Sequence, residues 1–165
     1  MLSLLKKKKK APAKAMIGWR EWCALPELGL PAIRAKTDTG ARTSALHAYD
    51  IEYFKKGSKN YVRFKVHPLD KNSKLVRKCK APLIGKRTVI SSNGKKEIRP
   101  VIQTELKIGE NVFVTELTLT SRHTMNFRML LGRKAMRAGR FTVNPGRSFL
   151  MGKITNPQKL YKKKK

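Results

Sequence analysis

One carboxylate in the sequence stands where it could do chemistry. Asp38 begins the stretch Asp38-Thr39-Gly40-Ala41, directly after an apolar segment that is predicted to be a strand over residues 32–36. A carboxylate that a tight turn holds at the end of a strand can take a proton from a water molecule and so begin a hydrolysis. The same residues also fit an ordinary β-turn, in which the aspartate accepts hydrogen bonds from the local backbone. The turn alone therefore leaves both interpretations open.

A second informative segment, residues 127–133, lies about ninety positions further along the chain. It contains two apolar residues followed by a glycine, Leu130-Leu131-Gly132. A short helix is predicted for residues 133–138, because Gly139 ends the pattern, and a final strand is predicted for residues 141–143. This second segment strengthens the interpretation of Asp38 as a site residue.

The elements between these two segments are predicted to be strands. Apolar stretches are short and are interrupted by Gly, Pro or Asn about every ten residues, which is typical of an all-β domain. Asn93-Gly94 supplies the positive φ angles of a hairpin tip, so residues 88–90 and 96–98 are expected to pair around it. Alternating apolar residues predict a long second hairpin that turns at residues 109–111. The apolar positions of that hairpin are Ile98, Ile102, Leu106, Ile108, Phe113, Leu117 and Leu119, and further strands are expected at residues 17–24, 48–54 and 61–66.

The order of these elements resembles the retropepsin family of aspartic peptidases. In that family an Asp-Thr-Gly turn is followed by a flap hairpin, a long hairpin, an apolar-apolar-Gly segment, a short helix and a terminal strand. Residues 16–152 are more closely similar to the bacterial retropepsin-like family that is labelled as ATP-dependent zinc proteases. The resemblance implies an all-β fold, namely a retropepsin-like closed β-barrel with one short C-terminal helix that is active as a homodimer. It is carried by residues 17–22, 36–47, 62–68, 91–94 and 144–150.

The resemblance assigns catalysis to Asp38. Aspartic peptidases use two carboxylates that share one proton around a water molecule, and this chain has one such motif, so the resemblance implies that Asp38 pairs with its symmetry mate in a homodimer. Thr39 is then expected to bond across the two-fold axis, Gly40 to let the backbone approach the substrate, and Gly132 to let the chain pack beneath the turn. The flap that closes over the water is expected to be Ser91, Ser92, Asn93 and Gly94, with a plain surface hairpin as the alternative.

The residues after the turn depart from the family pattern. Retropepsins commonly carry an acidic residue just after Asp-Thr-Gly-Ala, whereas here Arg42 and Thr43 follow Ala41, so Arg133 lacks its usual carboxylate partner. Arg42 can hold a substrate carboxylate through two hydrogen bonds, which suits glutamate side chains or a C-terminal carboxylate. Substrate contacts are thus predicted for Ala41, Arg42, Thr43, Arg87, Arg128 and the four flap residues, with a solvated or structural charge as the alternative for each arginine.

The charge of the chain also favours an acidic partner. Its 165 residues contain 39 Lys+Arg and 10 Asp+Glu, which gives a formal net charge of +29. Residues 1–15 and 153–165 hold six lysines each and no acid, and they are expected to be disordered Lys-rich tails that flank a peptidase domain over residues 16–152. Contact of these tails with the ribosome or RNA is expected, because a cationic surface attracts polyanions.

Two functions follow from these observations. Members of the bacterial family often accompany an ATP-grasp ligase that adds glutamates to the C-terminus of a small-subunit ribosomal protein. The resemblance therefore implies hydrolysis of peptide bonds in acidic or polyglutamylated protein tails, such as those of a ribosomal protein. The alternative is a basic β-barrel that binds RNA or the ribosome without catalysis.

No metal ion or cofactor is predicted, in spite of the family label. His47, His67 and His123 are scattered, whereas a zinc peptidase needs a His-Glu-x-x-His motif or three suitably spaced ligands, and no phosphate-binding loop for ATP is present. Two cysteines, Cys23 and Cys79, exclude a disulfide framework and favour a reducing compartment, with one disulfide as the alternative. No apolar run is long enough for a bilayer or a secretory signal, so we expect no membrane contact and a cytoplasmic location.

Overall fold

Strands make up most of the computed structural model, which describes residues 11–121 and 126–162. The strands are β1 (Ala15–Gly18), β2 (Arg20–Leu25), β3 (Leu30–Thr37), β4 (Ser44–His47), β5 (Tyr49–Lys56), β6 (Lys59–Val66), β7 (Arg77–Ile90), β8 (Lys96–Ile108), β9 (Asn111–Thr120), β10 (Met129–Leu131) and β11 (Phe141–Asn144). In the described residues there are two α-helices, α1 (Arg133–Ala138) and α2 (Gln158–Tyr161), and a 3-10 turn at Pro26–Leu28.

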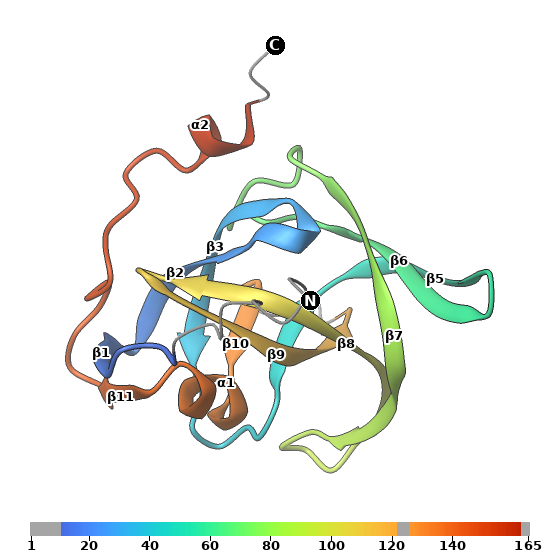
Figure 1. Cartoon of the computed structure of the whole chain (residues 1–165), viewed down its shortest axis with the longest axis horizontal. Helices are drawn as coiled ribbons and strands as arrows, with labels where there is room; N and C mark the ends of the chain where they lie inside the picture. Colours follow the sequence, from blue (N-terminus) through green and yellow to red (C-terminus); the bar gives the residue numbers. More distant parts are fainter. Residues whose placement is uncertain (1–10, 122–125, 163–165) are drawn as a thin grey trace, which may run out of the picture.

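Six of the strands close into a barrel (Figure 1). They follow one another in the order β2, β3, β10, β4, β9 and β8, and β8 returns to β2 where Lys107 lies opposite Ala24. Strands β7, β6 and β5 continue the sheet outward from β8, while β1 and β11 form a separate parallel pair. The prediction of an all-β, retropepsin-like closed barrel is confirmed. No helix among the described residues is long and apolar enough to cross a membrane.

The core of the barrel is built by alternation along its strands. Along β9, Phe113, Thr115 and Leu117 are buried, while the residues between them are exposed or only partly buried. Each large apolar side chain that is buried in this way contributes roughly 1.5–3 kcal/mol to stability. Ile98 differs from the prediction, because it is 70% exposed although it belongs to the alternating apolar positions of β8. Ile98 lies near the start of β8, where the strand belongs to the β7–β8 hairpin, and its partner on β7, Thr88, is exposed as well.

Most predicted elements are present, and several differ in their bounds. The predicted helix over residues 133–138 coincides with α1, and the hairpin tip at residues 91–94 joins β7 to β8. The predicted strand over residues 17–24 is instead divided between β1 and β2. At this break Gly18 packs so tightly that a Cβ would lie 2.1 Å from the backbone oxygen of Arg147, and the Trp19 amide donates to the same oxygen. The predicted strand over residues 48–54 likewise becomes β5, which begins at Tyr49.

The segment after the barrel lies against it, which differs from the disordered tail predicted for residues 153–165. Helix α2 places Tyr161 in a buried position, where its hydroxyl donates to the backbone oxygen of Ala32 in β3. Burial raises the pKa of Tyr161 to about 12, in spite of that hydrogen bond. An aromatic anchor in an otherwise basic segment therefore holds residues up to Lys162 near the barrel. The other predicted tail, residues 1–15, begins outside the described residues, and its last residue, Ala15, belongs to β1.

Candidate active site

Strand pairing fixes the position of Asp38. The short strand β10 lies between β3, to which it is parallel, and β4, to which it is antiparallel. Leu131 at the end of β10 pairs with Thr37, and the Asp38 amide donates to the Leu131 backbone oxygen over 2.9 Å. Asp38 is therefore the first residue of a loop, residues 38–43, that connects β3 to β4, and both of these strands pair with β10. We call this segment the Asp38 loop.

The Asp38 loop is shaped by hydrogen bonds among its own residues. The Gly40 amide donates to Oδ1 of Asp38 over 3.0 Å, and the Ala41 amide donates to the Asp38 backbone oxygen over 3.2 Å. One carboxylate oxygen is thus oriented by the backbone, while the side chain is only half-buried. The hydrogen bonds of a local turn are present, and the same turn orients the Asp38 carboxylate.

The segment that follows β10 clamps the Asp38 loop from below. The amides of Arg133 and Lys134 donate to the backbone oxygens of Ala41 and Arg42 over 2.9 and 3.0 Å. The side chain of Arg133 donates to the Thr39 backbone oxygen over 2.8 Å, so a carbonyl takes the place of the carboxylate partner that the sequence lacks. These bonds fix the loop at both of its ends.

Gly132 allows this close packing. A Cβ at this position would lie 2.7 Å from the Thr43 carbonyl carbon and 3.0 Å from the Ser44 amide nitrogen. The Gly132 amide donates to Oγ of the buried Ser44 over 2.9 Å. The expectation that Gly132 packs beneath the turn is in accord with this geometry.

A cleft of about 670 Å³ runs between the Asp38 loop and the β7–β8 hairpin. Figure 1 shows both segments at the lower edge of the barrel, the loop in cyan between β3 and β4 and the hairpin tip in yellow-green between β7 and β8. The loop contributes Asp38, Gly40, Ala41, Arg42 and Thr43 to the lining, and the hairpin contributes Arg87, Ser91 and Ser92. The cleft thus brings together eight of the predicted site residues from two distant parts of the sequence.

Four predicted site residues do not line this cleft. Thr39 is exposed on the loop, and Asn93 and Gly94 lie exposed at the hairpin tip. Arg128 lies elsewhere, where its backbone oxygen accepts a hydrogen bond from the His47 amide. The positive charge of Arg128 acts on Asp70. Burial raises the pKa of Asp70, and the charges of Arg34 and Arg128 offset only part of this rise.

Arg87 is held in the cleft by two partners. Its guanidinium donates to Oγ1 of Thr43 and to Oε2 of Glu116, both over 3.1 Å. Lys134 donates to the same oxygen of Glu116 over 3.1 Å. Partial burial raises the pKa of Glu116, but the hydrogen bonds from Lys134 and Arg87 outweigh this effect and hold the pKa below its ordinary value. Arg87 therefore crosses from the hairpin to the Asp38 loop.

Arg99 on β8 is a lining residue that the sequence did not indicate. Its residue as a whole is 7% exposed, and its Nε donates to Oε2 of Glu97 over 2.9 Å. The alternation of Ile98, Ile102 and Leu106 predicted that odd-numbered positions of β8 face solvent. Arg99, at an odd-numbered position, was therefore not predicted to line the cleft. A run of four buried residues, 99–102, replaces simple alternation where β8 meets the cleft.

Among the described residues, neither a metal-binding cluster nor a reactive thiol supplies an alternative site. No group of three His, Cys, Asp or Glu residues that could hold a metal ion occurs in the described part of the chain. Both cysteines are buried free thiols. Burial raises the pKa of Cys23 far above its ordinary value and that of Cys79 to about 12, so both remain protonated at neutral pH.

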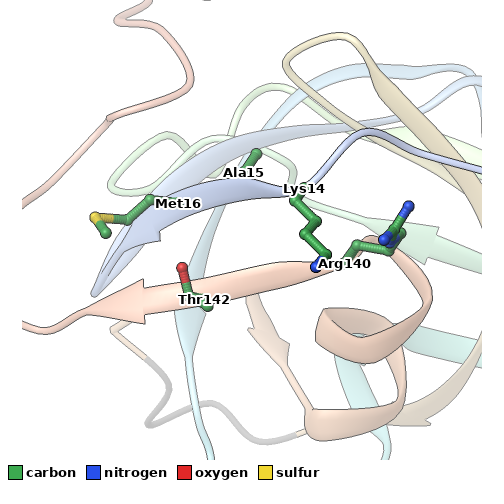
Figure 2. Close-up of a pocket in the computed structure, with 5 residues that line it drawn as sticks. All are labelled: Lys14, Ala15, Met16, Arg140 and Thr142. Atoms are coloured by element: carbon green, nitrogen blue, oxygen red, sulfur yellow. The ribbon is translucent and has the colours of Figure 1, made fainter.

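A second hollow, of about 640 Å³, lies beside the β1–β11 pair, and Figure 2 shows Lys14 reaching toward Arg140 there. Its other lining residues are Ala15, Met16 and Thr142. Proton transfer needs a group that can accept a proton near neutral pH, and none of these five side chains is a carboxylate, histidine or thiol. The cleft beside Asp38 is therefore the candidate active site.

Comparisons with known proteins bear on the family and the fold of the chain. Residues 16–154 match the sequence model of a family described as "Retropepsin-like aspartic endopeptidase RimB". Curated relatives from Shewanella pealeana and Desulfotalea psychrophila are each 45% identical, over 139 and 143 residues, and both are named "Probable alpha-L-glutamate ligase". These alignments cover 84% and 87% of this chain but 30% and 31% of the relatives, so the chain spans less than a third of their length.

The fold is also found in a solved structure. A crystal structure of a Legionella pneumophila protein of unknown function is similar, with a TM-score of 0.73 and 27% sequence identity. The similarity covers 84% of this chain and 99% of that protein.

Proposed function

The chain belongs to the RimB-like family of retropepsin-like aspartic endopeptidases, and we propose that it hydrolyses peptide bonds in acidic protein tails with Asp38 as the catalytic residue. One observation carries the proposal: the cleft combines an oriented carboxylate with arginines. Asp38 lies on one wall, and Arg42, Arg87 and Arg99 line the same cleft. The carboxylate suits water activation, and the arginines suit an anionic substrate.

The catalytic pair requires a second copy of the chain. Asp38 is the only acidic residue among the described residues that line the cleft. A second carboxylate is needed to donate a proton to the carbonyl oxygen while the first takes a proton from the attacking water. A homodimer with Asp38 at its two-fold axis supplies that pair. The Gly40 amide, which holds Oδ1 of Asp38, then leaves the other carboxylate oxygen to contact the water.

Glutamate-rich tails are the substrate that this cleft and the relatives suggest together. The curated relatives that contain a region 45% identical to this chain are named as glutamate ligases. A ligase that adds glutamates and a peptidase that removes them act on the same tail in opposite directions. Arg42 lies exposed beside Asp38, where it can bind a glutamate carboxylate of such a tail.

Mass spectrometry of a peptide ending in four glutamates tests the proposal. Wild-type protein is expected to shorten this peptide and to leave a matched alanine-tailed peptide intact, and Asp38→Asn is expected to abolish cleavage. Cleavage that persists in Asp38→Asn, or no cleavage by either protein, would contradict the proposal. In that case a basic module that binds RNA or the ribosome, consistent with the net charge of +29, becomes the better interpretation.

Mixing the two proteins tests the shared pair of carboxylates. A ninefold excess of Asp38→Asn is expected to reduce the activity of a fixed amount of wild type to about a tenth, because most wild-type chains are then paired with an inactive partner. Unchanged activity after full exchange of subunits would show that one chain suffices. Sedimentation of the mixture checks that dimers are present.

A further inference from the structure

Two arginines lie side by side on the hairpin wall of the cleft. Arg87 of β7 is directly opposite Arg99 of β8, and both line the cleft. Side chains that are directly opposite in an antiparallel pair project from the same face, with Cβ atoms about 4.5–5.5 Å apart. Like charges at this distance destabilise a sheet, so their presence needs a compensating interaction.

Each arginine has its own carboxylate, and neither carboxylate lines the cleft. Arg87 contacts Glu116 at 3.1 Å, and Arg99 contacts Glu97 at 2.9 Å. Glu97 is held in turn by the Thr120 hydroxyl, which donates to Oε1 over 3.1 Å. These contacts neutralise part of the charge and fix both guanidinium groups from the sides.

Arg99 has guanidinium donors that its partner Glu97 does not use. A guanidinium has five N–H groups, and among the described residues the bond to Glu97 through Nε is the one hydrogen bond that Arg99 makes through its side chain. The side chain as a whole is 8% exposed, and Arg99 lines the cleft. A nearly buried guanidinium with unused donors binds an incoming carboxylate more strongly than an exposed one does.

We propose that Arg99, together with Arg87, binds the side-chain carboxylate of a glutamate in the substrate and thereby selects acidic peptides. This inference rests on the proposed peptidase function and names the residues that give it specificity. A planar guanidinium can donate two parallel N–H groups to the two oxygens of a carboxylate, and two neighbouring arginines add to the positive charge that attracts it. Arg42, in contrast, is exposed on the opposite wall and has no such fixed partner among the described residues.

Peptide binding to the full chain carrying Asp38→Asn tests this inference without cleavage. Fluorescence anisotropy compares a labelled peptide that ends in four glutamates with one that ends in four glutamines. Arg99→Gln is expected to weaken binding of the glutamate peptide about tenfold or more and to leave the glutamine peptide within about twofold. The matched control is Arg137→Gln, which removes the same charge from an exposed position on α1 and is expected to change neither affinity.

Three results of the binding experiment would overturn the inference. The first is that Arg99→Gln binds the glutamate peptide with the same affinity as the protein that keeps Arg99. The second is that Arg137→Gln loses as much affinity as Arg99→Gln does. The third is that a short RNA displaces the peptide at the same concentration as free tetraglutamate does. If Arg99→Gln fails to unfold cooperatively on heating, Arg99→Lys replaces it. Lysine keeps the charge but loses the planar fork, so it is expected to bind the glutamate peptide several-fold more weakly than arginine does.

Kinetics separate this inference from the proposed function. Where wild type cleaves, Arg99→Gln is expected to raise KM for the glutamate peptide about tenfold with a much smaller change in kcat, because the contact is made in the bound substrate as well as in the transition state. If Arg99 is needed for peptide binding but no Asp38-dependent cleavage is seen, the peptidase proposal fails and the inference stands. Failure of the inference is Asp38-dependent cleavage with a KM that Arg99→Gln does not change.

Discussion

The two walls of the cleft are held in opposite ways. The Asp38 loop is fixed from outside, by β10 through the Leu131 oxygen and by the first turn of α1. The hairpin tip at residues 91–95 is held by bonds among its own residues. The Ser91 amide donates to the Lys95 backbone oxygen, the Gly94 amide donates to the Ser91 backbone oxygen, and residues 92–95 are exposed. The proposed catalytic carboxylate thus lies on the wall with outside contacts, and the proposed flap tip lies where such contacts are few, as a movable cover would require.

Gly132→Ala is the change that should break the rigid wall most completely. Its Cβ would lie 2.7 Å from the backbone of Thr43, which cannot move without displacing the Asp38 loop. We expect a loss of roughly 2–3 kcal/mol in the free energy of unfolding and a loss of most activity, measured by urea denaturation and peptide cleavage.

The matched control for this prediction is Gly146→Ala. A Cβ at Gly146 would lie 3.5 Å from the Asn144 side chain, an ordinary contact, and the residue is exposed. Its stability should therefore change by less than about 0.5 kcal/mol. If the two variants were equally stable and active, the clamp beneath the loop would not matter.

Ser44→Ala should weaken the same wall to a smaller degree. The buried Ser44 hydroxyl accepts a hydrogen bond from the Gly132 amide, and alanine would leave that buried amide without a partner. We expect the free energy of unfolding to fall by roughly 1–3 kcal/mol, with slower cleavage and little change in KM. Ser73→Ala, which alters an exposed serine, serves as the control. A Ser44→Ala protein as stable as this control would show that water replaces the hydroxyl.

The contact between the walls should depend on pH through Glu116. The pKa of Glu116 is lower in the folded protein than its ordinary value of 4.5, so its bonds to Arg87 and Lys134 stabilise the fold above about pH 4.5 and are lost as the pH falls through the folded value. Glu116→Gln is therefore expected to cost about 0.2–1 kcal/mol at pH 7, because solvent screens a contact whose cationic side chains, Arg87 and Lys134, are 41% and 37% exposed, and to cost less at pH 3. Urea denaturation at both pH values measures the difference. A cost that is the same at both values would exclude the ionic contact as its cause.

The sequence predicted the local features of both walls and missed residues that depend on distant partners. Local signals were sufficient for the Asp38 turn, for helix α1 and for the hairpin tip, since each depends on residues that are near one another in the chain. Arg99 could not be found in this way, because alternation assigned its side of β8 to solvent and only the β7–β8 pairing places it beside Arg87. Tyr161 was concealed for a similar reason, since its partner Ala32 is distant in sequence and lysines surround it. Residues whose role depends on a distant partner were thus the ones that sequence reasoning missed.

Asn93→Ala should have the smallest effect and so sharpens the contrast between the walls. Among the described residues, the hydrogen bonds that Oδ1 of Asn93 accepts come from within the tip, from the Ser91 hydroxyl and from the Lys95 amide over 3.4 Å. Its loss should cost less than about 0.5 kcal/mol in the free energy of unfolding, because the tip is exposed and contributes little to the core. Hydrogen exchange should nevertheless become faster at the Lys95 amide and remain unchanged at the Gly132 amide. Slower exchange or a large loss of stability would mean that the tip is part of the rigid structure, and the hairpin would then not act as a movable cover over Asp38.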